Sequence, residues 1–286
     1  MTIDNGMTRR DMIGRMVAGG VALGLGVASA PARATAFASR RIAVTVRGSG
    51  PDVLMIPGLA SGPGIWNGAV AAVPGYRYHL IQVRGFAGLA PDANAAGALL
   101  QPLMTDIVRY AATAGLVRPA VVGHSMGGTL AMMAALRGMV GRVMVVDMLP
   151  AGAGMVGGTT SGMGYLADQL GQFVTGTKAG REMFADMLAR QPGAQGSDPD
   201  VIARALTELA HTDLAPQLPR MAVPMRIVYA VPGDADGRAA AIQRYRAAYA
   251  GVRTASLLPI GPSGHMVMAD QPAAFAQALR TFLKPS

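Results

Sequence analysis

Residues 121–128 read Val-Val-Gly-His-Ser-Met-Gly-Gly, and their order is more informative than any other part of this 286-residue chain. An apolar run ends at Gly123 and an alanine- and methionine-rich stretch follows, so the pattern predicts a buried strand, a sharp turn and a helix. Gly123 and Gly127 flank Ser125, because side chains there would collide across so tight a turn. The stretch therefore predicts a serine hydroxyl that projects at the end of a strand.

Short apolar runs and helical patterns alternate along most of the chain. Strands are predicted at 41–47, 52–56, 78–83, 120–123, 142–147, 225–230 and 254–259, and helices near 64–73, 97–114, 127–139, 237–249 and 271–283. Such alternation predicts a mostly parallel sheet flanked by helices, with 41–47 as a half-buried edge strand. Between 150 and 221 the alternation stops. Glycine-rich turns and helical pieces near 165–175, 180–190 and 199–210 predict a helical insertion there.

The N-terminus carries the layout of an export signal. Arg9-Arg10 precede Met12-Ile13, an apolar stretch over 16–30 follows, and Ala32-Arg33-Ala34 ends it. This layout resembles a twin-arginine signal peptide, in which paired arginines come before an apolar segment and a small-residue cleavage site. We expect residues 1–34 to be removed after Ala34, with the mature chain periplasmic or secreted and the twin-arginine translocation machinery as export partner. A retained anchor is the alternative, although an apolar stretch of about 15 residues is short for a span.

Composition excludes several classes of protein. The chain has no cysteine, which excludes disulfides, thiolate metal sites and a cysteine nucleophile. The formal charge is +9, but the arginines stand singly or in pairs, so we expect a solvated basic surface and no nucleic-acid partner. No phosphate-binding loop or histidine cluster is present in the sequence, so we expect neither a metal nor a cofactor. The oligomeric state is left open.

Four features together resemble the α/β-hydrolase fold superfamily. They are the Gly-x-Ser-x-Gly turn at 123–127, Ile56-Pro57-Gly58-Leu59 after an early strand, Val83-Arg84-Gly85-Phe86 after the next, and Gly264-His265 before Asp270-Gln271-Pro272. Gln82 stands where the superfamily commonly has an aspartate. The resemblance implies an α/β-hydrolase core at 35–148 and 221–286, with a helical cap inserted at 149–220. It also implies a serine, an acid and a histidine in that order along the chain.

The chain has four histidines, and one of them is the best candidate base for Ser125. A serine hydroxyl needs a neighbouring base to take its proton during attack. His265 follows the last strand and is expected to return over the sheet edge, whereas His124 leaves the turn in another direction and is expected to pack. His79 and His211 are expected to be surface or core residues.

The histidine in turn needs a carboxylate that fixes its tautomer. The resemblance favours the loop after 225–230, where Asp234 is the first choice and Asp236 the second. Asp147, at the end of the strand after the serine turn, is the third candidate. Any of the three could instead cap a helix, and Asp236 is well placed to do so.

The resemblance assigns the oxyanion hole to the backbone N–H groups of Met126 and Leu59. Two side chains are candidates for the pocket, the single tryptophan Trp66 and the methionine Met148, with plain packing as the alternative for both. Methionine suits loosely defined apolar substrates, so a small apolar substrate is expected.

The sequence thus predicts an exported serine hydrolase that cleaves a carboxylic ester through an acyl-enzyme. The alternatives are lactone, amide or carbon–carbon bond hydrolysis, or cofactor-free haloperoxidase-like activity, on the same residues. A non-catalytic binding protein that keeps the fold is the alternative from another class.

Overall fold

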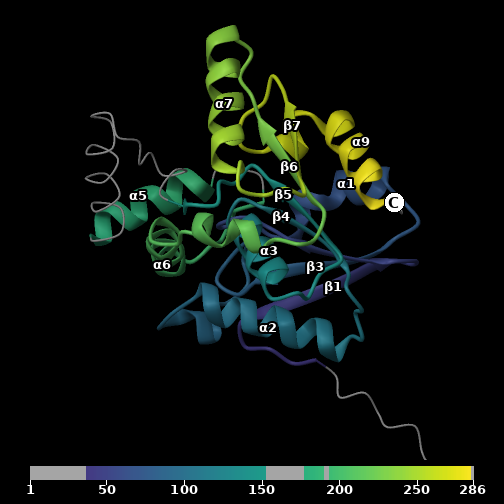
Figure 1. Cartoon of the computed structure of the whole chain (residues 1–286). Helices are drawn as coiled ribbons and strands as arrows, with labels where there is room; N and C mark the ends of the chain where they lie inside the picture. Colours follow the sequence, from purple (N-terminus) through teal and green to yellow (C-terminus); the bar gives the residue numbers. More distant parts are fainter. Residues whose placement is uncertain (1–36, 153–176, 190–192, 285–286) are drawn as a thin grey trace, which may run out of the picture. The chain divides into compact units, whose positions relative to one another are not determined.

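The structure is a computed structural model, and it describes residues 37–152, 177–189 and 193–284 (Figure 1). The predicted leader at 1–34 and the predicted helical piece at 165–175 lie outside the described residues. The strands are β1 (Ile42–Gly48), β2 (Asp52–Ile56), β3 (Arg77–Val83), β4 (Ala120–His124), β5 (Arg142–Val146), β6 (Met225–Ala230) and β7 (Ala255–Ile260). All seven predicted strands are therefore present, within two residues of the predicted bounds.

The described helices also follow the prediction, except for the short α8, which is not predicted. They are α1 (Asn67–Ala72), α2 (Leu100–Thr113), α3 (Met126–Leu136), α5 (Lys178–Ala189), α6 (Pro199–Ala210), α7 (Ala235–Ala248), α8 (Val267–Asp270) and α9 (Pro272–Leu283). Short 3-10 turns cover η1 (Pro63–Trp66), η2 (Asp92–Ala95) and η4 (Ala215–Arg220). None of the helices in the described ranges is both long enough and apolar enough to cross a membrane.

The sheet has the strand order β1-β3-β2-β4-β5-β6-β7. β1 pairs antiparallel with β3 at one edge, as expected of 41–47, and all other pairs are parallel. The chain begins the parallel part at β2 near the centre, moves outward to β3 and returns to β4, after which each strand is added beside the last. The carboxyl ends of β2, β4, β5 and β6 consequently meet along one edge, where ligands bind in open parallel sheets.

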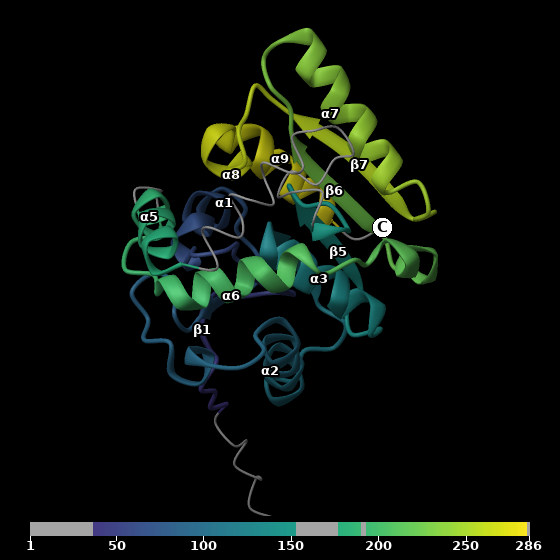
Figure 2. The ribbon, with the colours of Figure 1, turned by 90° about the vertical axis from the view of Figure 1, so that its left-hand side faces the viewer.

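Both faces of the sheet are buried. On β2, Leu54 and Ile56 lie in the core on one face, while Val53 and Met55 lie in the core on the other, and β4 and β5 alternate in the same way. Helices α2 and α3 cover the first face and α1 and α9 the second, so α2 and α9 lie on opposite sides of the sheet (Figures 1 and 2). This explains why the central strands are continuous apolar runs.

The predicted insertion leaves and rejoins the core at adjacent points. The N–H of Gly152 donates to the carbonyl of Thr212, and that of Leu214 donates to Pro150. Between them Ala151 and Asp213 form an isolated antiparallel bridge. These contacts close the base of a segment whose described helices are α5 and α6, and η4 follows directly after it.

Helix α6 is tied to the core by charged side chains. The two carboxylate oxygens of Glu208 accept hydrogen bonds from the backbone N–H groups of Leu99 and Leu100, at 2.7 and 2.8 Å, at the start of α2. The guanidinium of Arg204 donates to the carbonyls of Asn94 and Ala95. A carboxylate at a helix N-terminus also compensates the helix dipole, so α6 and α2 stabilise each other.

Candidate active site

Ser125 is the single residue between β4 and α3, and its backbone is strained. Its φ of 51° and ψ of −121° lie in a region that residues with a side chain rarely adopt. A side chain at Gly123 would overlap the backbone of Gly127, and one at Gly127 would overlap the carbonyl of Ile56. The two glycines are therefore required by close backbone contacts, as the sequence predicts.

Asp147 occupies the equivalent position one strand further along. It directly follows β5 with a positive φ of 48°, and its N–H continues the ladder to the carbonyl of Val228 on β6. The N–H of Ser125 likewise bonds the carbonyl of Val146. Two strained residues with reactive or charged side chains thus lie at the ends of adjacent strands.

His265 reaches this edge from the loop between β7 and α8. Its Nδ1 lies 2.7 Å from Oδ2 of Asp147. A carboxylate can only accept, so Nδ1 carries the proton and Nε2 presents its lone pair elsewhere. The His265 side chain is 44% exposed, which leaves the far side of the ring accessible to a substrate.

Two further donors hold the Asp147 carboxylate. Its Oδ1 accepts from the backbone N–H of Ala230 at 3.0 Å and from the hydroxyl of Tyr245 at 2.9 Å. Burial alone would raise the pKa of Asp147, but the hydrogen bonds from His265, Ala230 and Tyr245 outweigh it and hold the pKa below its usual value. The carboxylate is therefore ionised although it is buried.

The structure corrects the choice of acid. Asp234, the first choice, is exposed and accepts a hydrogen bond from the N–H of Gly237 at 2.6 Å, which makes it the N-cap of α7. Asp236 is exposed in the first turn of that helix. The chain turns outward into α7 after β6, so the contact with His265 is made by Asp147, the third candidate.

His124 packs, as expected, and it also supports the histidine loop. The residue is buried, its ring centroid lies 4.6 Å from that of His265, and its Nε2 lies 3.0 Å from the carbonyl oxygen of His265. Burial, followed by the proximity of His265, lowers the pKa of His124 to about 3. Its ring is therefore neutral at physiological pH and carries its proton on Nε2. Because the ring is buried, it is not accessible to act as a base.

The other two histidines lie away from Ser125. His79 is buried between the Tyr110 hydroxyl, 2.5 Å from Nδ1, and the Asp52 carboxylate, 2.8 Å from Nε2. His211 ends α6, where its Nδ1 donates to the carbonyl of Thr207. His79 is thus a core residue and His211 a surface residue, a choice that the sequence leaves open.

The loop after β2 lies directly against the serine turn. A side chain at Gly58 would come within 2.8 Å of the His124 ring and 3.1 Å of the Ser125 Cβ, so only glycine permits this approach. Ala60, two residues on, has a positive φ of 58°. Within the described residues, no backbone hydrogen bond uses the N–H of Leu59 or Met126. Both of the predicted oxyanion donors are thus uncommitted.

Ser197, in the insertion, contacts the loop after β2. Its hydroxyl oxygen lies 2.8 Å from the carbonyl oxygen of Ala60 and accepts from the N–H of Ala87 at 2.9 Å. Nearby, the N–H of Gly62 donates to the carbonyl of Gly193. The sequence gives no sign of this role for Ser197.

Both pocket candidates are core residues. Trp66 is fully buried and stacks on Phe275, with ring centroids 6.1 Å apart, in the core on the α1 and α9 face. Met148 is buried beside Gly128, and its carbonyl accepts from the Tyr249 hydroxyl. The packing alternative therefore describes both.

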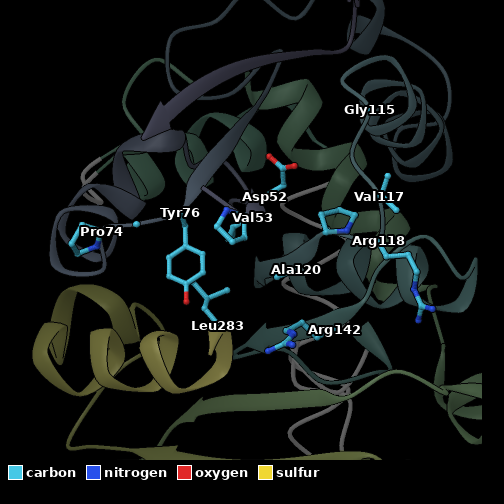
Figure 3. Close-up of a pocket in the computed structure, with 13 residues that line it drawn as sticks. Asp52, Val53, Pro74, Tyr76, Gly115, Val117, Arg118, Ala120, Arg142 and Leu283 are labelled. Atoms are coloured by element: carbon cyan, nitrogen blue, oxygen red, sulfur yellow. The ribbon is translucent and has the colours of Figure 1, made fainter. Parts of the chain in front are cut away.

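A groove of about 770 Å³ lies at the opposite edge of the sheet (Figure 3). Its lining includes Asp52, Ala120 and Arg142, which are the first residues of β2, β4 and β5. It is therefore at the amino ends of the strands and separate from Ser125. In the described ranges no group of three or more histidine, aspartate or glutamate side chains could hold a metal ion.

Comparison with known proteins shows the family of the chain. Residues 53–278 match the alpha/beta hydrolase family, and the chain belongs to that family. No curated protein sequence matches the chain.

Solved structures of the same fold are similar over most of the chain. An esterase from Exiguobacterium antarcticum superposes with a TM-score of 0.65 and 20% identity, covering 85% of this chain and 96% of its own. An enol-lactonase from Burkholderia xenovorans has a TM-score of 0.60 and 20% identity, with the same coverage. A hydrolase from Pseudomonas aeruginosa has a TM-score of 0.66 and 18% identity, covering 85% and 94%.

Proposed function

We propose that this protein is a serine hydrolase that cleaves a carboxylic ester of a small apolar substrate through an acyl-enzyme. The observation that carries the proposal is the 2.7 Å hydrogen bond between Asp147 and His265 at the sheet edge where Ser125 lies. A strained serine, a histidine with a fixed tautomer and an ionised acid are the three groups that acyl transfer requires.

In the acylation step, the Ser125 Oγ attacks the acyl carbon while His265 Nε2 takes the hydroxyl proton. The negative charge on the carbonyl oxygen is stabilised by the uncommitted N–H groups of Met126 and Leu59. Collapse of the tetrahedral intermediate breaks the bond to the alcohol, which leaves with the proton from His265. Asp147 stabilises the imidazolium throughout and stays ionised.

In the deacylation step, water takes the place of the alcohol. His265 accepts a proton from the water as it attacks the acyl carbon of the ester on Ser125. The second tetrahedral intermediate expels the Ser125 oxygen, which recovers its proton from His265, and the carboxylic acid is released. The enzyme is then in its starting state, and no cofactor takes part.

The ester preference is supported by the chemistry of the site and by one of the similar structures, which is an esterase. Another similar structure is an enol-lactonase, and a lactone is an ester whose alcohol stays attached to the acyl group. The same residues could therefore open a lactone ring, so the experiment must compare the two substrate types.

The proposal is tested with p-nitrophenyl acetate, butyrate and octanoate beside γ- and δ-lactones and an anilide. We expect turnover of at least one short ester and labelling of Ser125 by a fluorophosphonate, with both lost in Ser125→Ala. A folded protein that hydrolyses none of the substrates and is not labelled would support the non-catalytic alternative. Turnover confined to the lactones would change the substrate class and keep the mechanism.

We also propose that the protein is exported through the twin-arginine translocation machinery and cleaved after Ala34. The support is the sequence layout of Arg9-Arg10, the apolar stretch and Ala32-Arg33-Ala34. Expression in a bacterium with that machinery should give a periplasmic protein that begins at Thr35. Replacing both arginines by lysine should retain the precursor in the cytoplasm, and periplasmic precursor in that variant would contradict this route.

A further inference from the structure

Tyr245 contacts the acid of the candidate triad from a helix that carries none of the three triad residues. Its hydroxyl donates to Oδ1 of Asp147 at 2.9 Å, on the oxygen that His265 does not use. Tyr245 is only 4% exposed, so water does not compete for this hydrogen bond. The carboxylate is thereby held at both oxygens.

The tyrosine ring is itself held in place. It stacks on Tyr229 of β6, with centroids 4.2 Å apart and planes 16° apart, and on Tyr249 one turn further along α7, at 6.3 Å. Tyr249 is equally buried, but its hydroxyl donates to the backbone carbonyl of Met148 at 2.6 Å. The stack fixes where the Tyr245 hydroxyl points. It also contains Tyr249, a buried tyrosine that makes no hydrogen bond to Asp147.

We infer that Tyr245 is a positioning residue for the reaction. Its hydroxyl orients the Asp147 carboxylate and determines how strongly that carboxylate attracts the proton on His265. This inference rests on the proposed function of Ser125, His265 and Asp147. Tyr245 acts through Asp147 and contacts no reacting atom.

The direction of the tuning follows from electrostatics. A hydrogen bond donated to Oδ1 disperses the carboxylate charge, so it weakens the attraction of Asp147 for the imidazolium form of His265. Without the donor, the charge on Asp147 is more localised and the imidazolium is favoured.

The titratable groups that face Asp147 are His265, His124 from β4, and Tyr245 and Tyr249 from α7. Burial, followed by the charge of Asp147, raises the pKa of both tyrosines, so they remain neutral donors in the working range.

The test compares Tyr245→Phe with Tyr249→Phe, which removes a buried hydroxyl from the same stack but no hydrogen bond to Asp147. For Tyr245→Phe we expect kcat on a p-nitrophenyl ester to fall roughly tenfold to a hundredfold, since hydrogen bonds to charged groups are strong. KM should change less than twofold, and the acid limb of the kcat/KM profile should move to higher pH. Tyr249→Phe should lose stability with the pH profile unchanged.

A readout independent of catalysis keeps this inference separate from the proposed function. The four histidines can be labelled with ¹³C, and the ring signal of His265 can be assigned with His265→Gln and followed by NMR as the pH changes. Its midpoint should rise in Tyr245→Phe and stay in Tyr249→Phe. If no ester is hydrolysed and the midpoint still moves, the function fails and the coupling of Tyr245 to the pair holds. Equal behaviour of the two variants in both the pH profile and the titration would overturn the inference.

Discussion

The Nε2–H of His124 donates to the backbone carbonyl of His265 at 3.0 Å, and the centroids of the two rings lie 4.6 Å apart. The residue before Ser125 therefore holds the loop that carries the proposed base. This contact joins the end of β4 to the loop after β7, two segments 141 residues apart in sequence. It also places a neutral, buried ring where a charged one would repel His265.

The neutral state of His124 makes stability depend on pH. The folded-state pKa of about 3 is below the ordinary value of 6.5, so between these values the unfolded chain binds a proton that the folded chain does not. The contribution of His124 to the free energy of unfolding is complete above about pH 6.5 and is lost as the pH falls toward 3. The loss is on the order of a few kcal/mol for this group alone.

The glutamine variant tests this dependence, because its amide can still donate to the carbonyl of His265 but does not titrate. Urea unfolding at pH 4, 5, 6 and 7 should show a smaller loss of stability toward low pH in His124→Gln than in the natural protein. His211→Gln, which replaces an exposed histidine, is the control and should follow the natural protein. Parallel curves for all three proteins would contradict the assignment.

Replacing Asp147 by asparagine should change kcat greatly, whereas the same replacement of Asp234 should change it little. Asp147→Asn keeps the volume but removes the charge that orients His265, so kcat should fall by about 10³- to 10⁴-fold. Asp234→Asn should leave kcat within about twofold, and should cost at most about 1 kcal/mol of stability because asparagine is also a good N-cap. Ester kinetics and thermal melting of both variants decide the matter. A large loss of kcat in Asp234→Asn with Asp147→Asn active would reverse the assignment.

Ser125 and His265 should behave as one unit. Ser125→Ala and His265→Ala should each lower kcat by roughly 10⁴-fold or more, and the double variant should lose no more than the worse single one. The measurement is hydrolysis of p-nitrophenyl butyrate, with circular dichroism to show that each variant is folded. Additive losses would mean that the two side chains act in separate steps.

The sequence predicts the fold well because its signals are local. Apolar runs such as 120–123 and 142–147 are buried on both faces, and the glycines at 123 and 127 are required by backbone contacts only a few residues away. The positions of Ser125 and His265 in the fold are also predictable, since one stands in a distinctive turn and the other is a rare residue after the last strand, while their roles stay predictions.

The acid is not predictable in the same way. Asp147 and Asp234 both follow strands, and the choice between them depends on whether the chain bends inward after β5 or outward into α7. The positive φ of Asp147 and the contacts from Ala230 and Tyr245 exist only in the folded molecule. Tyr245 has no sequence signal because it lies 98 residues from the carboxylate it contacts.

Ser197 links the insertion to the oxyanion loop, so its loss should affect both stability and rate. Ser197→Ala removes a hydroxyl that accepts from the N–H of Ala87 and shares its proton between the carbonyls of Ala60 and Ala194. The loss should cost about 1–2 kcal/mol of stability and lower kcat severalfold as Leu59 loses its position. Ser256→Ala removes a hydroxyl on β7 that donates to the carbonyl of Met225, away from the loop after β2, and serves as the control. Denaturant unfolding and ester kinetics measure both effects, and an unchanged kcat in Ser197→Ala would show that the loop is held by other contacts.

Gly127 tests the close packing of the serine turn on β2. An added Cβ would overlap the carbonyl oxygen of Ile56 and come within 2.7 Å of that of Pro57, both backbone atoms that cannot move aside. Gly127→Ala should therefore cost at least about 3 kcal/mol of stability and abolish turnover, because any shift displaces Ser125 and Met126 together. Gly68→Ala in α1 is the matched control, since nothing lies within 4 Å of its added Cβ and alanine favours a helix, so stability should stay equal or rise by up to about 1 kcal/mol. Thermal melting of the two variants beside the natural protein gives the comparison, and a Gly127→Ala protein as stable as the Gly68→Ala one would mean that β2 and the serine turn are further apart than described.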